Sequence, residues 1–127
     1  MTFLIWTLII AALLPYLAKG PVAHAMNKLG GYDNKHPRSQ QGKLTGFGAR
    51  ALAAHQNAFE SFMIFSAAIL LAITTKHTGE NIQQLASIYL AARIIYNILY
   101  LANIGILRSL VWFISLGCSL AIMVLCL

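Results

Sequence analysis

The sequence predicts an all-α integral membrane protein, a single domain built as a bundle of four transmembrane helices. Of its 127 residues, 59% are hydrophobic and 9% are charged, a balance too apolar for an ordinary soluble domain. The hydrophobic residues gather in four long runs separated by polar stretches. A helix needs about 20 such residues to cross the hydrocarbon core of a bilayer, so each run supplies one span.

The first predicted span covers residues 1–18 and stops at Lys19-Gly20-Pro21. As a helix it is about 27 Å long, close to the minimum for crossing a membrane. The stretch Ala23-His24-Ala25 resembles a signal-peptide cleavage site. We nevertheless expect the span to be retained, because its start carries no basic residue and its apolar run is too long for a signal peptide.

The remaining spans are predicted at residues 47–75, 82–102 and 104–127. The connections between these three are only a few residues long, so neighbouring helices should run antiparallel. A single long loop, residues 19–46, separates the first span from the second.

Charge patterning predicts how the chain is oriented. Nine lysines and arginines face three acidic residues, and six of the nine cations lie between Lys19 and Arg50. Cations between apolar segments follow the positive-inside rule, so they give no reason to expect a nucleic-acid partner. We expect a multi-pass protein of the bacterial inner membrane, with the long loop in the cytoplasm and both termini outside.

Two ionisable residues lie inside predicted spans, Glu60 in the second and Arg93 in the third. Such a residue costs about 2.5 to 3.5 kcal/mol at the centre of a membrane helix, so each must face protein, water or the other. Counting inward from the cytoplasmic helix ends at about 1.5 Å per residue puts both about 15 Å deep. Asn57 and Tyr96 are level with each other at about 10 Å.

These residues belong to two polar stripes that are predicted to meet. The residues of each stripe are spaced so that they lie on one face of a helix. Arg108, at the start of the fourth span, lies at about the same depth as Tyr100. The alternative is a purely structural Glu60–Arg93 ion pair with interfacial tyrosines. The candidate residues are Arg50, Asn57 and Glu60 on the second span, Arg93, Tyr96 and Tyr100 on the third, and Arg108 on the fourth.

The histidines and cysteines do not indicate a metal site. Cys118 and Cys126 would be about 12 Å apart on one helix, too far for a disulfide, so we expect both to pack in apolar surroundings. His55 lies off the polar stripe and is predicted to be a structural or subunit-contact residue. No histidine pair has metal-ligand spacing with a cysteine or carboxylate.

The motifs Asn57-Ala58-Phe59-Glu60 and Ala92-Arg93-Ile94-Ile95-Tyr96, together with Arg50, Tyr100 and Arg108, resemble those of the MAPEG family, membrane-associated proteins of eicosanoid and glutathione metabolism. The likeness covers nearly the whole chain. It implies a homotrimer of four-helix subunits that binds glutathione between adjacent subunits, near the cytoplasmic face.

The resemblance also implies residue roles. Arg50, Asn57, Glu60, Arg93 and Tyr96 match positions that hold glutathione, and Arg108, allowing for a one-residue shift, matches the arginine that holds the thiolate, with Tyr100 beside it. The chain departs from the family at one position, where Ala53 replaces an arginine that glutathione-conjugating relatives often carry. The loop cations that would substitute for it are Lys35, Arg38 and Lys43.

The residue chemistry fits glutathione as co-substrate, because the tripeptide brings two carboxylates, an ammonium and a thiol. Lowering the thiol pKa from about 8.5 to about 6.5 needs roughly 2.7 kcal/mol of thiolate stabilisation, which one arginine in a low dielectric supplies. The predicted function is a glutathione transferase or peroxidase-like enzyme acting on a lipophilic electrophile. Two alternatives stay open, a non-catalytic member of the same fold and a small multidrug transporter that uses Glu60.

Overall fold

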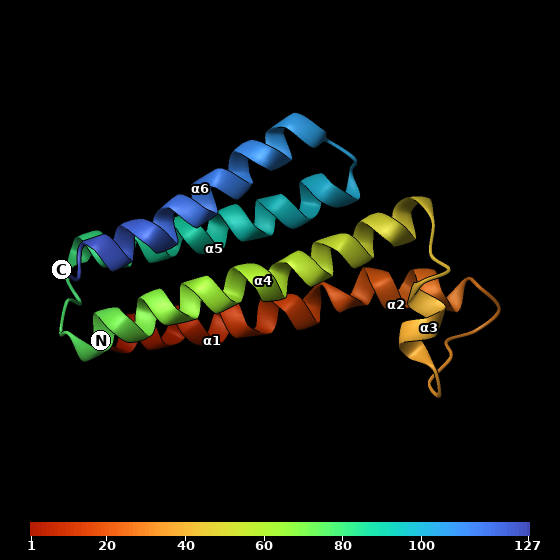
Figure 1. Cartoon of the computed structure of the whole chain (residues 1–127), viewed down its shortest axis with the longest axis horizontal. Coiled ribbons are helices and arrows are strands. Elements are labelled where there is room, and N and C mark those ends of the chain that lie inside the picture. The colour runs from red at the N-terminus through yellow and green to blue at the C-terminus, as the bar shows by residue number, and fades with distance from the viewer.

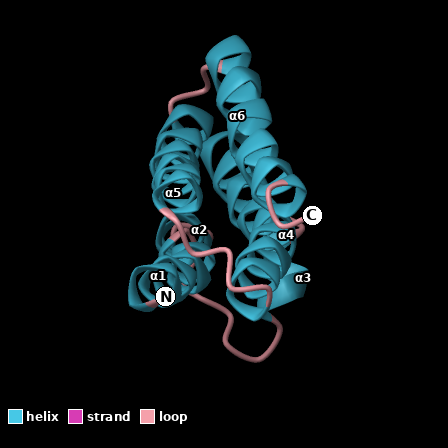
Figure 2. Cartoon of the chain, turned by 90° about the vertical axis from the view of Figure 1, so that its left-hand side faces the viewer, coloured by secondary structure: helices cyan, strands magenta, loops and turns pink.

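The computed structural model describes all 127 residues and contains helices but no strands. Two helices run end to end along a third, and a further antiparallel pair lies beside them (Figure 1). Both termini lie at the same end of the bundle, which faces the viewer in Figure 2. The helices are α1 (Thr2–Leu17), α2 (Lys19–Asn27), α3 (Pro37–Gln41), α4 (Gly46–Thr74), α5 (Glu80–Leu101) and α6 (Gly105–Val124).

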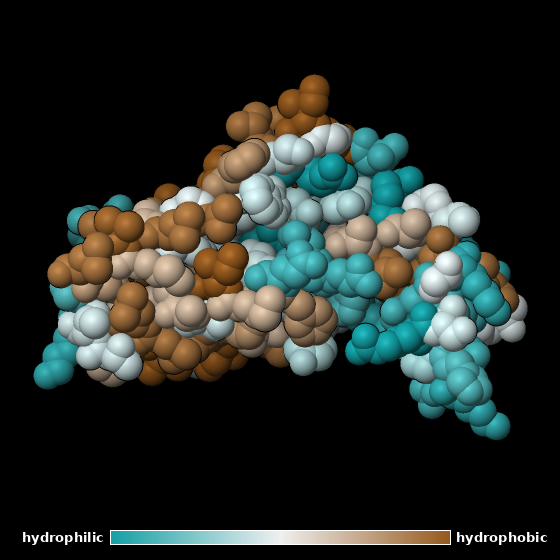
Figure 3. Space-filling model, in the orientation of Figure 1, coloured by the Kyte–Doolittle hydropathy of each residue, from teal (hydrophilic) through white to brown (hydrophobic).

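Four helices are long and apolar enough to cross a membrane, which confirms the predicted fold class. Large apolar side chains remain exposed along them, as expected for surfaces that face lipid. In Figure 3 the half of the molecule near the termini is mostly apolar, whereas hydrophilic residues cover the opposite end and extend into the middle of the face. The spans are Thr2–Asn27, Phe47–Thr74, Glu80–Leu101 and Gly105–Val124.

The first span differs from the prediction, because the chain stays helical beyond residue 18. Ala18 alone separates α1 from α2, and its backbone is itself right-handed helical, with φ −65° and ψ −16°. Pro21 is the third residue of α2. The first turn of a helix does not need its N–H donors, so this proline does not end the span. The expected loop at residues 19–46 therefore shrinks, and it also contains the short helix α3.

Tight turns with left-handed residues end α4 and α5. Asn103 has φ 61°; its N–H bonds the Tyr100 carbonyl at 3.1 Å, and the Ile104 N–H bonds the Leu99 carbonyl at 2.9 Å. This pattern is the Schellman motif, and asparagine is among the residues that adopt its left-handed position. Lys76, with φ 63°, makes the equivalent turn after α4. These turns make α4, α5 and α6 successive antiparallel neighbours.

An apolar cluster of 12 buried residues joins α1, α4, α5 and α6 at the end that holds the termini. At the edge of the cluster farthest from the termini, the rings of Phe65 and Tyr89 stack with their centroids 3.8 Å apart and their planes 2° from parallel. Cys118 and Cys126 are buried, free members of this cluster. The cluster consists of Leu4, Ala11, Phe65, Ala68, Ile69, Ala72, Ile82, Ala86, Tyr89, Cys118, Ile122 and Cys126.

Candidate functional site

A polar cluster lies between α4, α5 and α6, centred on Arg93, which is only 4% exposed. The guanidinium donates a hydrogen bond of 2.7 Å to Asn57 Oδ1 on α4 and one of 3.5 Å to Ser115 Oγ on α6. It also lies over the Tyr96 ring, 4.2 Å from the centroid. A buried cation in a membrane protein requires such partners, and here one arginine connects three helices.

Glu60 does not form the direct ion pair with Arg93 that the sequence left open, since the only acid–base contact within 4.0 Å joins His36 to Asp33. Instead Asn57 connects the two, accepting from Arg93 through Oδ1 and donating from Nδ2 to Glu60 Oε2 at 3.4 Å. Glu60 is exposed and lies fourteen residues from either end of α4. A carboxylate therefore stands on the surface of the chain at the middle of a membrane span.

A second cation and ring continue the cluster toward the turn between α5 and α6. The Arg108 guanidinium lies over the Tyr100 ring, 4.3 Å from its centroid. The Tyr100 ring meets the Tyr96 ring edge-on, with centroids 5.7 Å apart and planes at 77°. The four side chains form one row, from Arg93 through Tyr96 and Tyr100 to Arg108.

Two small cavities flank this row, and Trp112 lines both. One, of about 140 Å³, lies between α4 and α6 and is lined by Asn57, Glu60 and Ser115 among others. The other, of about 190 Å³, lies between α5 and α6 beside Tyr96, Tyr100 and Arg108. Pockets that enclose a drug-sized ligand measure about 300 to 1,000 Å³. Neither cavity of the single chain is large enough to enclose a tripeptide.

Comparison with known proteins decides the family. The MAPEG family model matches residues 3–127, nearly the entire chain. The chain belongs to the MAPEG family. Neither the search of curated proteins nor the search of solved structures gave a match. Membership supports a multi-pass membrane protein with a function related to glutathione in general.

In this MAPEG protein, Arg50 stands apart from the other candidate residues. It lies on α4 seven residues before Asn57, about 10 Å along the helix, and no contact joins it to the polar cluster. Its Nε is buried without a hydrogen-bond partner. The loop cations Lys35, Arg38 and Lys43 are exposed, and they too have no contact with the cluster. The structure thus assembles six of the seven predicted residues and leaves Arg50 outside.

Sequence reasoning missed the α6 side of the cluster. Ser115 accepts from Arg93 and in turn donates to the Trp112 carbonyl at 2.8 Å. Arg108, Trp112 and Ser115 are spaced at 0, 4 and 7 residues, the same one-face pattern that identified the stripes on the two preceding helices. That spacing was a usable signal.

A second contact that the sequence did not predict lies one helical turn from the cluster, on the side of the termini. Ser61 Oγ and Tyr89 Oη are 2.9 Å apart, and Tyr89 is also part of the apolar core. His55 has the structural role expected of it, because its Nδ1 lies 2.7 Å from the Pro15 carbonyl oxygen on α1. Its ring also contacts Phe59 edge-on at 5.2 Å.

Proposed function

We propose that this MAPEG protein is a glutathione-dependent membrane enzyme, transferase-like or peroxidase-like, that activates the glutathione thiol for attack on a lipophilic electrophile. The observation that supports this most is the polar cluster of α4, α5 and α6, in which Asn57 connects Glu60 to the row of Arg93, Tyr96, Tyr100 and Arg108. These groups match the charges of the tripeptide, and they lie in a span where any unsatisfied polar group is costly.

Each group has a role that follows from its chemistry. Glu60, an exposed acceptor, holds the ammonium, while Asn57 and Tyr96 hydrogen-bond the peptide units. Arg93 is bonded to Asn57 and Ser115 and fixes the cluster while offering its remaining N–H groups to a carboxylate. Arg50, whose Nε lacks a partner, takes the other carboxylate when the ligand spans the distance along α4.

The proposed oligomer is a homotrimer with the site at subunit borders. Exposed Glu60 supports it, because a carboxylate facing lipid at mid-span is unfavourable, and a neighbouring subunit removes that contact. The two small cavities also need a second wall to enclose the tripeptide. Native mass spectrometry in mild detergent should therefore show three chains per particle. A monomer that binds glutathione with full affinity would contradict the trimer.

The proposed membrane orientation places the loop before α4 in the cytoplasm and both termini outside. The cations of residues 19–50 support it through the positive-inside rule. In a bacterial inner membrane the row from Arg93 to Arg108 then points toward the cytoplasm, where glutathione is available. An electrophile dissolved in the bilayer reaches the same site from the side.

Arg108 is the proposed thiolate-stabilising group, and Tyr100 is its neutral partner. Charge-assisted hydrogen bonds are about twice as strong as neutral ones, so Arg108→Ala should raise the pKa of the bound thiol and slow conjugation more than Tyr100→Phe does. Glutathione affinity should change little in both variants. Ultraviolet absorbance of the thiolate against pH, together with the conjugation rate of an aromatic electrophile, measures both effects.

The matched control for this experiment is Lys76→Ala, which removes a cation at the opposite end of α4 and should leave thiolate and rate unchanged. An unchanged titration and rate in Arg108→Ala would remove that residue from the mechanism. Glutathione binding without any thiolate signal in the parent protein would instead favour the non-catalytic alternative.

A further inference from the structure

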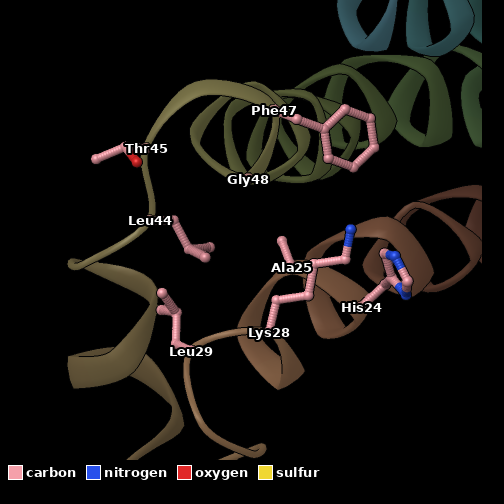
Figure 4. A pocket seen from close by; sticks show the side chains of 8 residues that line it. All are labelled: His24, Ala25, Lys28, Leu29, Leu44, Thr45, Phe47 and Gly48. Atoms are coloured by element: carbon pink, nitrogen blue, oxygen red, sulfur yellow. The ribbon is translucent and has the colours of Figure 1, made fainter.

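A cavity of about 490 Å³ lies between α2 and the start of α4, apart from the polar cluster. Figure 4 shows His24 on α2 and Lys28 directly after it, with Phe47 on α4 opposite. The lining combines two basic side chains with apolar ones and includes no acidic residue. Its residues are His24, Ala25, Lys28, Leu29, Leu44, Thr45, Phe47 and Gly48.

Both basic side chains of the cavity are without a partner inside the chain. Neither His24 nor Lys28 makes a side-chain hydrogen bond, an ion pair or an aromatic contact, in contrast to Lys19, which lies 5.8 Å over the Tyr32 ring. The nearest acid in sequence, Asp33, is already engaged by the backbone N–H groups of Lys35 and His36, each at 3.0 Å. The cavity therefore contains the uncompensated charge of Lys28 beside the His24 imidazole, a combination that favours an anionic ligand.

The cavity lies where the membrane-spanning helices leave the hydrocarbon. The first span runs continuously from Thr2 to Asn27, and His24 is 22 residues into it, about 33 Å along the axis. A hydrocarbon core is about 30 Å thick, so His24 and Lys28 fall in the headgroup layer. Phe47 begins the second span at the same level.

The apolar part of the lining faces the same opening. Phe47 is 41% exposed and Leu29 48% exposed, and both border the cavity. Behind them α2 and α4 pack closely, because a Cβ added at Gly48 would lie only 3.0 Å from Ala25 Cβ. A ligand for this cavity thus needs an anionic head and an adjoining hydrocarbon chain.

We propose that the cavity binds an anionic phospholipid, with the phosphate on Lys28 and His24 and the first acyl carbons against Phe47 and Leu44. The contact resembles the attraction of basic juxtamembrane groups to acidic lipids, but it is confined to one preformed site. It is independent of the glutathione site, whose residues do not line the cavity.

The test measures lipid binding to the purified full-length protein in mild detergent by native mass spectrometry. Dioleoyl phosphatidylglycerol should bind at least about ten times more tightly than dioleoyl phosphatidylcholine, and Lys28→Gln should weaken the phosphatidylglycerol complex about ten-fold, the size of one charge-assisted contact. His24→Gln provides a second variant that reports on the same site. Lys43→Gln, a loop cation outside the lining, is the matched control and should bind within two-fold of the parent, roughly the limit of a screened surface charge.

Several results would overturn the proposal. Equal affinity for the two lipids would show that the cavity does not select charge. Unchanged phosphatidylglycerol binding in both Lys28→Gln and His24→Gln would place the lipid elsewhere. Inorganic phosphate competing as well as the lipid would make the cavity a simple anion site. Displacement of the lipid by glutathione would assign the cavity to the thiol substrate.

Discussion

The two ends of the bundle are built from the same helices but held together by different contacts. Near the termini, α4, α5 and α6 meet through the apolar cluster, which includes the stacked Phe65 and Tyr89 rings. Toward the other end the same helices meet through Arg93, its hydrogen bonds and cation–ring contacts, and small cavities lie between them. The Ser61–Tyr89 contact marks the boundary.

This difference suggests that one end of the bundle provides stability and the other end provides space for a ligand. Close-packed apolar contacts supply most of the stability, because each lost side chain costs both its contacts and a cavity. The polar end contributes fewer such contacts and leaves space beside charged groups. A ligand site can therefore occupy the polar end without loosening the packed end. Separate measurements of stability and ligand affinity can test this division.

The largest effect is expected from Phe65→Ala in the packed end. Phe65 is completely buried and stacked on Tyr89, so its removal should lower the free energy of unfolding by about 3 to 5 kcal/mol. The control is Met63→Ala on the same helix, where the side chain is 65% exposed and the loss should be small. Reversible unfolding in mixed detergent micelles measures both. Equal losses in the two variants would show that the packed end is not the source of stability.

A smaller effect, on affinity, is expected from Arg93→Ala in the polar end. The substitution removes the 2.7 Å bond to Asn57 and the proposed ligand contact, so glutathione binding should weaken by about 2 kcal/mol, roughly 30-fold. Unfolding should be affected less than in Phe65→Ala. Calorimetric titration with glutathione gives the affinity, with Lys76→Ala as the control for loss of a distant cation. Unaltered affinity in Arg93→Ala would remove this cluster from the glutathione site.

The sequence was sufficient to predict the features that depend on one helix at a time. Span number follows from run length, and the Asn57–Glu60 and Arg93–Tyr100 stripes follow from helical spacing. The sequence did not predict that the first span continues as a helix through Pro21. A proline ends a helix when it lies in the interior but is tolerated in the first turn, and the sequence alone does not show which of these positions Pro21 occupies.

Features that depend on how helices face each other were not predictable in the same way. Depth counting made Glu60 and Arg93 level, yet it did not reveal that Glu60 faces outward and contacts Asn57 rather than Arg93. It also did not separate Arg50 from the cluster, because two residues on one stripe can still lie about 10 Å apart along the axis. Ser115 was different, since its spacing from Arg108 was visible and was not used.

The smallest expected effect, and a gain, concerns Ala53→Arg. Ala53 lies four residues before Asn57 on the same face of α4, about 6 Å along the helix and partly buried in the polar end. An arginine there adds one contact to a glutathione carboxylate, so affinity should rise by about 1 kcal/mol, roughly five-fold. Gln56→Arg adds the same charge on another face and should leave calorimetric affinity unchanged. Equal gains from both variants would mean that general electrostatic attraction, and not the position of the arginine, causes the increase.

The two ends of the bundle should also differ in their tolerance of a new charge. Ala53→Arg should fold, whereas Ala68→Arg should not, because Ala68 is fully buried in the apolar cluster and no partner there compensates the charge.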